Sequence, residues 1–195
     1  MNLLTEKLPT AVKVDGKAYE VNYDFRTCLK IILAFEDPSL AQIEKQAILL
    51  QLFYKEIPDN STEAITQCVR FLNGGEETLP DEAGGERLYS FEKDAQFIYA
   101  AFKHTHNIDL EKESMHWWKF IALFMDLGSD TTFSNLISLR SRVKSGKATK
   151  EEREAAIELG SIFEVPDNTN KTLEELEAED NFMKRLNRGK NGCGL

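Results

Sequence analysis

The chain has 195 residues, of which 42% are hydrophobic and 29% are charged, and its formal net charge is −9 at pH 7. This length fits one domain or two small ones, and the hydrophobic fraction is sufficient for a buried core. The acidic balance argues against general binding to nucleic acid or anionic lipid, because both need a clustered excess of Lys and Arg. A basic or amphipathic partner fits this composition better.

The cysteine spacing, the first residues and the length of the apolar runs indicate the cellular compartment of the protein. Cys28, Cys68 and Cys193 are widely spaced and lack the C-x-x-C pattern of zinc and redox motifs. The first seven residues contain an acid and a base with no long apolar stretch behind them, unlike a secretory signal. The longest apolar run, 117–127, is interrupted by charges and is shorter than the roughly 20 residues that span a bilayer. We therefore expect free thiols in a reducing cytoplasm and no membrane span.

Residues 10–21 predict a β-hairpin. The Asp15-Gly16 pair favours a two-residue turn with positive φ at both positions, and apolar residues alternate on either side of it. An isolated hairpin is marginal in water, so we expect this one to pack on other elements. The alternating residues are Val12, Val14, Tyr19 and Val21.

Two helices are predicted after the hairpin. The first runs from Asp24, its N-cap, to about Glu36, and Pro38 ends it. The second fits residues 41–54. The expected apolar stripes are Phe25, Leu29, Ile32 and Leu33 in the first helix and Ile48, Leu49, Leu52 and Phe53 in the second.

A third helix and a loop follow. Asn60 or Ser61 caps this helix, and Glu63 is placed to complete a capping box with Asn60. Its stripe is Ile65, Val69 and Leu72, and Gly74-Gly75 ends it. Residues 74–87 are rich in Gly and acids and nearly free of apolar side chains, so they predict a mobile acidic loop.

Three more helices are predicted in the next sixty residues. Ser90 caps one that ends near Asn107. The segment 114–127 is apolar around its whole circumference, so it is expected in the centre of the core or shared between the core and an interface. Another helix starts at Thr132 or Ser134. The apolar stripe of the first of these helices is Phe91, Ala95, Ile98, Tyr99 and Phe102. That of the third is Phe133, Leu136, Ile137 and Leu139.

Two capping boxes predict the last helices. Thr149 with Glu152 opens a helix from Lys150 to about Phe163, and Thr172 with Glu175 opens another over residues 173–188. The last helix is acidic in its early turns and basic at its end, as the helix dipole favours. Its stripe is thin, so we expect it to gain order by packing on a neighbour, including one in another chain. That stripe is Leu173, Leu176, Phe182, Met183 and Leu186.

Together these elements predict a mainly α fold, with a small N-terminal β-hairpin followed by a bundle of about seven to eight helices. The predicted division of the chain is a helical domain, 1–167, and a C-terminal helix with a flexible basic tail, 168–195.

The sequence contains no pattern of catalytic, cofactor-binding or metal-ligating residues that we would assign. His104 and His106 would point about 200° apart on a helix, and neither these nor His116 has a Cys or carboxylate pair at ligand spacing, so solvated helix-end histidines are expected. The motifs of serine hydrolases, zinc proteases, phosphate loops and dinucleotide sites are missing from the sequence. The acidic clusters 151–154 and 174–177 lie in first helical turns and are read as solvated caps. We do not expect an enzyme.

The predicted helix over 114–127 and the C-terminal helix are candidates for protein binding. Adjacent Trp117 and Trp118 would point about 100° apart, so one ring can lie in the core and the other at an interface. A stacking platform for bases or sugars is the alternative, and the acidic charge disfavours it. One face of either helix is expected to bind a partner or a second copy. The candidate residues are Trp117, Trp118, Phe120, Phe124, Leu176, Phe182 and Met183.

Several stretches have a distinctive order of residues. The most specific is His116-Trp117-Trp118-Lys119-Phe120 with Ala122-Leu123-Phe124 after it. The others are Asp24-Phe25-Arg26-Thr27, residues 54–59, residues 91–102, Phe133-Ser134 and Leu139-Arg140-Ser141. Together they closely resemble the bacteriophage Gp15 protein family, and the likeness extends from the hairpin to Val165-Pro166-Asp167.

The resemblance implies a tail morphogenesis protein of phages and prophages of Gram-positive bacteria, encoded between the major tail protein and the tape measure protein. That position resembles the slot of the tail assembly chaperones, which coat the tape measure protein during assembly and recruit tube subunits. It implies the tape measure protein and the major tail protein as partners. From the thin stripe and the charge pattern of the C-terminal helix we also expect self-association as a homo-oligomer, and the reducing cytoplasm expected above would be that of the bacterial host. No catalytic residue, cofactor or metal comes with the family.

Two other functions stay open at this point. One is a structural tail completion or connector component of the virion. The other is a nucleic-acid-binding regulator, which would need a basic face, and only the end of the last predicted helix offers one. We expect neither nucleic acid nor a membrane as a partner.

Overall fold

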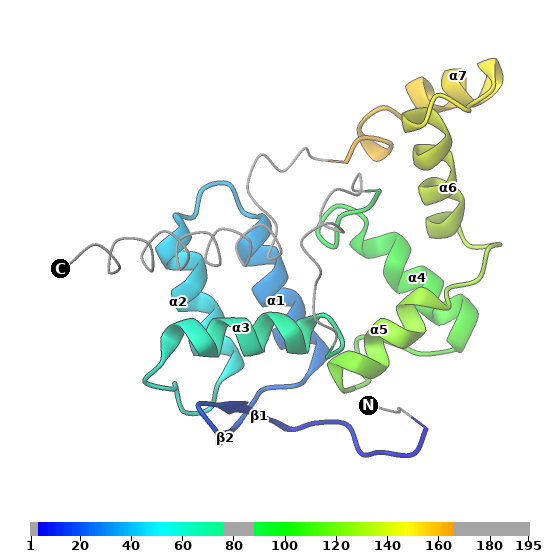
Figure 1. Ribbon diagram of the computed structural model, residues 1–195. Coiled ribbons are helices and arrows are strands. Elements are labelled where there is room, and N and C mark those ends of the chain that lie inside the picture. The colour runs from blue at the N-terminus through cyan, green and yellow to red at the C-terminus, as the bar shows by residue number, and fades with distance from the viewer. Residues whose placement is uncertain (1–3, 76–87, 166–195) are drawn as a thin grey trace. The chain divides into compact units, whose positions relative to one another are not determined.

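The computed structural model describes residues 4–75 and 88–165 (Figure 1). In these ranges the chain forms seven α-helices and one two-stranded antiparallel sheet, which confirms the predicted mainly α class with an N-terminal hairpin. Two compact units lie on either side of the gap at 76–87, and each is described by itself. Most of the predicted acidic loop and the whole predicted C-terminal helix lie outside the described residues.

The hairpin in the first unit forms as predicted. Strands β1 (Ala11–Val14) and β2 (Lys17–Glu20) pair with Val14 opposite Lys17, which leaves Asp15-Gly16 as the two-residue turn. The φ angles are 49° at Asp15 and 81° at Gly16. Aspartate tolerates the left-handed region better than most residues, and glycine adopts it without a steric penalty. Helix α3 packs on β1, so the hairpin has the neighbour it needs.

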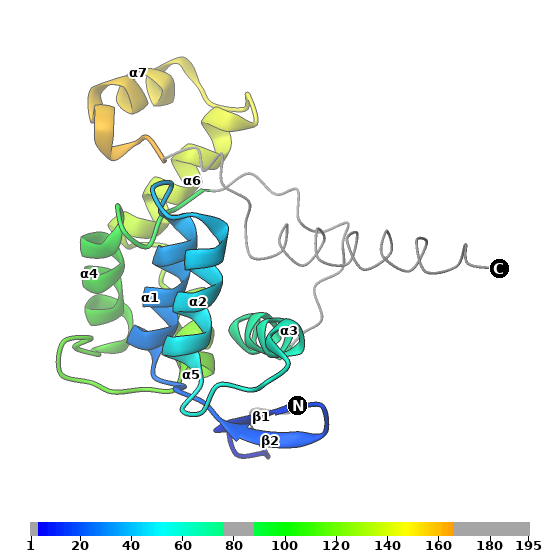
Figure 2. The ribbon, with the colours of Figure 1, turned by 90° about the vertical axis from the view of Figure 1, so that its left-hand side faces the viewer.

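Three helices complete the first unit: α1 (Phe25–Glu36), α2 (Gln42–Phe53) and α3 (Ser61–Leu72). Helices α1 and α2 lie side by side, and α3 runs across them (Figure 1, Figure 2). The predicted cap Asp24 accepts a hydrogen bond from the Arg26 amide at 3.0 Å. The bounds of these helices agree with the sequence patterns to within one or two residues.

The cap of α3 is Asn60, whose Oδ1 accepts from the Glu63 amide at 3.1 Å. The predicted capping box is wrong in its second half. The Glu63 carboxylate instead accepts a hydrogen bond from Gln67 Nε2 at 2.7 Å, one turn further along the helix.

The buried face of α1 also differs from the prediction. The predicted stripe residues Leu29, Ile32 and Leu33 are only half-buried. Because α1 is apolar over most of its circumference, periodicity alone could not select the face that meets α2. The buried residues are Phe25, Cys28, Ile31 and Phe35.

Helix α2 buries a lysine. The predicted Leu49 and Phe53 are buried, and so is Lys45, which is only 3% exposed. The Lys45 ammonium donates to the Phe35 carbonyl at 2.9 Å, in the last turn of α1. A cation at this place satisfies a carbonyl that the helix itself leaves without a donor.

The second unit contains α4 (Ala95–His106), α5 (Trp117–Met125), α6 (Thr132–Lys144) and α7 (Lys150–Leu159), followed by one 3₁₀ turn, Gly160–Ile162. Helix α4 packs on α5 and α6, and α6 also packs on α7. Asn107 ends α4 in the left-handed conformation, with φ of 53°, at the predicted position.

Two helix starts in this unit differ from the prediction. The Ser90 hydroxyl accepts from the Lys93 amide and closes a separate turn, so α4 begins only at Ala95. Helix α5 begins at Trp117, three residues later than predicted. Helix α6 begins at Thr132, one of the two predicted starts, and its cap is Thr131, whose hydroxyl oxygen accepts from the Ser134 amide at 3.2 Å.

Helix α7 begins as predicted and ends early. Thr149 and Glu152 form the capping box, with amide-to-side-chain distances of 3.2 and 3.0 Å. The helix was expected to reach Phe163, but Gly160 has φ of 51° and ψ of −123°, values that end the helix at Leu159.

Candidate functional site

The predicted binding residues of α5 lie in an aromatic cluster of the second unit. Trp117, Trp118, Phe120 and Phe124 are between 1% and 9% exposed. Phe120 stacks between Trp117 and Phe102, with ring centroids 5.5 and 5.0 Å away. Phe124 contacts three further rings, those of Tyr89, Phe91 and Phe133.

Because these four side chains of α5 are buried, they take part in the packing of the unit. The four aromatic side chains fill the cluster and offer little area to a partner in this conformation. Their predicted part in protein binding stays a prediction, and Leu176, Phe182 and Met183 lie outside the described residues. The side of α5 that carries Ile121, Ala122 and Met125 is more exposed.

We call this side the α5 outer face; it consists of Ile121, Ala122 and Met125, and at about 100° per residue it lies beside Trp118 and away from Phe120. Ile121 is half-buried and Ala122 is exposed. Met125 is 78% exposed, and charged Lys119 and Asp126 are exposed beside it. Methionine suits a binding surface because its flexible, polarisable side chain adapts to different partners.

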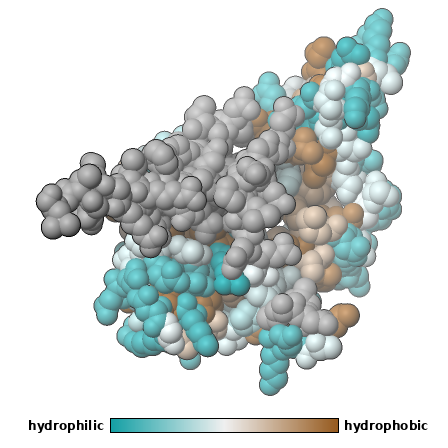
Figure 3. All heavy atoms as spheres, in the orientation of Figure 1, coloured by the Kyte–Doolittle hydropathy of each residue, from teal (hydrophilic) through white to brown (hydrophobic). Residues whose placement is uncertain are grey.

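Helix α7 presents a second set of exposed apolar side chains. Of its ten residues only Ala156 is buried, and the contact with α6 accounts for it. Ile157 is 78% exposed, Leu159 36% and Ile162, in the following 3₁₀ turn, 43%. Brown spheres mark this part of the surface among teal ones (Figure 3). The sequence contains a signal for these residues, Ala155 followed by Leu159 one turn later, which the predicted binding residues do not include.

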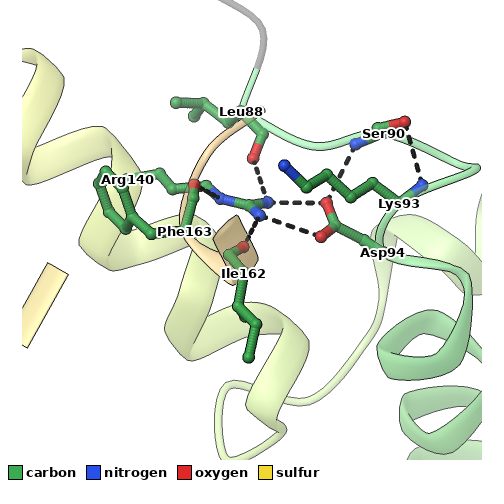
Figure 4. A network of polar contacts seen from close by, with 7 residues as sticks. All are labelled: Leu88, Ser90, Lys93, Asp94, Arg140, Ile162 and Phe163. Atoms are coloured by element: carbon green, nitrogen blue, oxygen red, sulfur yellow. Dashed lines mark hydrogen bonds and ion pairs between the residues drawn. The ribbon is translucent and has the colours of Figure 1, made fainter. Parts of the chain in front are cut away.

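A buried ion pair organises the same unit. Arg140 of α6 and Asp94, the residue before α4, are each 1% exposed, and their side chains form two parallel hydrogen bonds of 2.7 and 3.0 Å (Figure 4). The remaining N–H groups of the guanidinium donate to the carbonyls of Leu88, Ile162 and Phe163 at 2.7 to 3.0 Å. All five donors of the arginine are therefore satisfied.

The position of Asp94 is set by its own loop. Its carboxylate also accepts from the Ser90 amide at 3.0 Å, and the Asp94 amide donates to the Ser90 carbonyl at 2.9 Å. Through Arg140 this loop is joined to Leu88, the first described residue of the unit, and to Phe163 near its last. The network therefore closes the unit end to end, which gives it a structural role.

The histidines take part in ordinary polar contacts. Exposed His104 pairs with Asp130 at 3.0 Å, and His106 is 2.8 Å from the Leu123 carbonyl. The prediction of solvated helix ends is wrong for His116, which is 9% exposed and whose Nδ1 accepts from the Trp118 amide at 3.0 Å as the N-cap of α5. Among the described residues, no three His, Cys, Asp or Glu side chains are grouped to hold a metal ion.

Two thiols are buried in the first unit. Cys28 on α1 and Cys68 on α3 are free and have no exposed area. Burial raises the pKa of both thiols above the ordinary value, because the thiolate would lose its hydration. This environment disfavours nucleophilic chemistry at either sulfur.

Comparisons with known proteins identify one family. A family model described as Bacteriophage Gp15 protein matches residues 4–165. No curated protein and no solved structure matches the chain. None of the helices in residues 4–75 and 88–165 is both long enough and apolar enough to cross a membrane.

Proposed function

Because the chain belongs to the Bacteriophage Gp15 protein family, we propose that it is a tail assembly protein that acts as a chaperone of the tape measure protein. It works in the cytoplasm of the bacterial host, self-associates, and delivers the tape measure protein to the major tail protein. The family match supports a phage protein, and the tail role rests on the resemblance of residues 116–124 and the other motifs.

The observation that carries protein binding is the α5 outer face. Met125 is an apolar side chain that the chain itself leaves 78% exposed. Phe120 and Phe124 of the same helix pack in the aromatic cluster, which holds the helix in place while Met125 stays exposed. An exposed apolar side chain on a rigid helix is a good anchor for a partner.

A tape measure protein suits this face chemically. It is long and amphipathic, so its apolar stripes need cover before the tail tube closes around it. An amphipathic helix binds by laying its apolar side against an apolar surface. The charged neighbours Lys119 and Asp126 provide a polar rim for such a contact.

Co-expression with the tape measure protein of the same phage tests the proposal. We expect the two proteins to co-purify and the tape measure protein to stay soluble. Met125→Lys should abolish co-purification, whereas Ile43→Lys, at a residue 72% exposed on α2 of the first unit, should preserve it. Equal retention by the two variants would remove the α5 outer face from the proposal, and no co-purification by the unmodified chain would refute the chaperone function.

Purified virions separate this function from a structural tail component. Mass spectrometry should detect the major tail protein and miss this chain, because a chaperone leaves before the particle is complete. Stoichiometric amounts in the particle would instead establish a completion or connector protein. Light scattering tests self-association, and a strict monomer at high concentration would contradict it.

A further inference from the structure

We propose that helix α7 binds the same helix of a second copy of this chain in an antiparallel pair. The contact uses one side of α7, which we call the α7 pairing face and which consists of Lys150, Arg153, Glu154 and Ile157. The proposal names a surface for the self-association included in the proposed function, on which it rests, and it does not depend on binding of the tape measure protein.

Helix α7 is held mainly on one side. It packs on α6, and Ala156 is its one buried residue. Within the second unit it lies beyond the end of α6, away from α4 and α5 (Figure 1, Figure 2). It has ten residues, and isolated helices shorter than about 12–15 residues are marginal in water. A further partner would therefore stabilise it.

The α7 pairing face points away from α6. Its four residues follow the spacing i, i+3, i+4 and i+7, so at about 100° per residue they lie within about 100° of one another. The centre of the face lies roughly 130° from the side that carries Ala156 and Glu152, the partner of Arg142 on α6. All four side chains are exposed, and Ile157 is 78% exposed. This side is open to a second helix.

An antiparallel pair makes this face complementary to itself. When the twofold axis crosses between Arg153 and Glu154, each Arg153 faces Glu154 of the second copy, which gives an ion pair on either side of the axis. Ile157 then faces Lys150 of the second copy, whose methylene stem covers it while the ammonium stays in water. A parallel pair would instead place Arg153 against Arg153 and Glu154 against Glu154, and like charges repel. The charge pattern therefore selects the antiparallel arrangement.

The charged residues are available for this contact. Glu154 pairs with Lys150 of its own helix at 3.7 Å, and both side chains are more than half exposed, so solvent screens this pair. Arg153 donates from Nε to the Thr149 carbonyl and from Nη2 to the Ala148 carbonyl, which fixes its side chain beside the start of α7. An arginine that is already fixed loses less conformational entropy when it forms an ion pair.

The contact is small, so we expect it to be weak. Two helical turns bury less area than the roughly 1,200 Å² at the lower end of stable interfaces. Its ion pairs lie close to solvent, so salt should weaken it further. Association through α7 is therefore expected at high micromolar concentration and low ionic strength.

Charge reversal followed by mixing tests the proposal on the full-length chain. Arg153→Glu places two acids at the centre of the face and Glu154→Arg places two bases there, so each variant should repel its own copies. Light scattering should give a dissociation constant at least about tenfold higher for each variant than for the unmodified chain. An equimolar mixture should recover the constant to within about threefold, because each acid then faces a base. A variant that failed to fold would not recover on mixing.

Lys112→Glu and Glu113→Arg are the matched controls. These two neighbouring residues are exposed, lie between α4 and α5 of the same unit, and their substitutions change the net charge by the same amounts. Each control variant should associate like the unmodified chain. Ile157→Ser removes the apolar member of the face, so it should weaken association. Its urea midpoint should stay unchanged, because the side chain is already exposed.

The outcomes separate this proposal from the proposed function. Unchanged association by Arg153→Glu and Glu154→Arg would overturn the α7 pair and leave self-association to another surface. A mixture that stays dissociated would overturn the antiparallel pair as well. If both variants lose the tape measure protein but still self-associate, that partner occupies the face and the proposal fails. A strict monomer for the unmodified chain would overturn the α7 pair together with self-association, whereas co-purification alone decides the chaperone function.

Discussion

Replacing Arg140 tests how the second unit is held together. Arg140→Ala would leave the Asp94 carboxylate buried without its partner and take N–H donors from three carbonyls, those of Leu88, Ile162 and Phe163. Removing one partner of a buried ion pair costs about 3–5 kcal/mol. A typical domain has an unfolding free energy of only about 5–15 kcal/mol, so this loss would be a large part of the stability of the unit.

Arg142 on the same helix is the matched control. Its side chain is 42% exposed and pairs with Glu152 at 2.8 Å, so solvent screens the interaction. Arg142→Ala should therefore cost only about 0–1 kcal/mol. The two arginines differ by two positions in sequence and share α6, so a general loss of helix propensity would affect both alike.

Urea unfolding followed by tryptophan fluorescence is the assay. The chain has two tryptophans, Trp117 and Trp118, and both belong to the second unit, so the signal reports on that unit even if the first unfolds separately. The double variant Arg140→Met with Asp94→Leu should be more stable than Arg140→Ala, because it leaves no buried charge. Equal small losses for Arg140→Ala and Arg142→Ala would refute the reasoning.

Three further predictions concern the core, a cap and the thiols. Phe120→Ala should lower the unfolding free energy by about 3–5 kcal/mol in the same assay, because it empties the space between two stacked rings. Thr149→Ala should cost about 1 kcal/mol by removing the N-cap of α7. Cys28 and Cys68 should react with a thiol reagent only after unfolding. Because burial raises their pKa, the thiols of the unfolded chain ionise first, so the stability of the first unit should fall as pH rises through their ordinary value of 9.0. Urea midpoints followed by circular dichroism, which also reports on the helices of this unit, will show the decline. Midpoints that stay constant would contradict this last expectation.

Most of the secondary structure follows from local sequence patterns, because the signals involved act over a few residues. The Asp15-Gly16 turn, the Asp24 cap and the capping box of Thr149 with Glu152 all formed where their patterns indicated. Each joins groups no more than three residues apart, so neighbouring residues suffice to set them. The start of α4 was placed too early because the Ser90 hydroxyl caps a separate turn before Ala95, which looks like a helix cap in the sequence.

The packing of segments distant in the chain determines which faces are buried and which polar groups meet. Arg140 and Asp94 are 46 residues apart, and nothing around either one indicates the other. Helix α5 is apolar all round, so only its packing could turn Phe120 inward and leave Met125 exposed. Local patterns report the conformation of a segment. The partner of a side chain depends on segments distant in the chain, and the free energy of burying it appears only once they have come together.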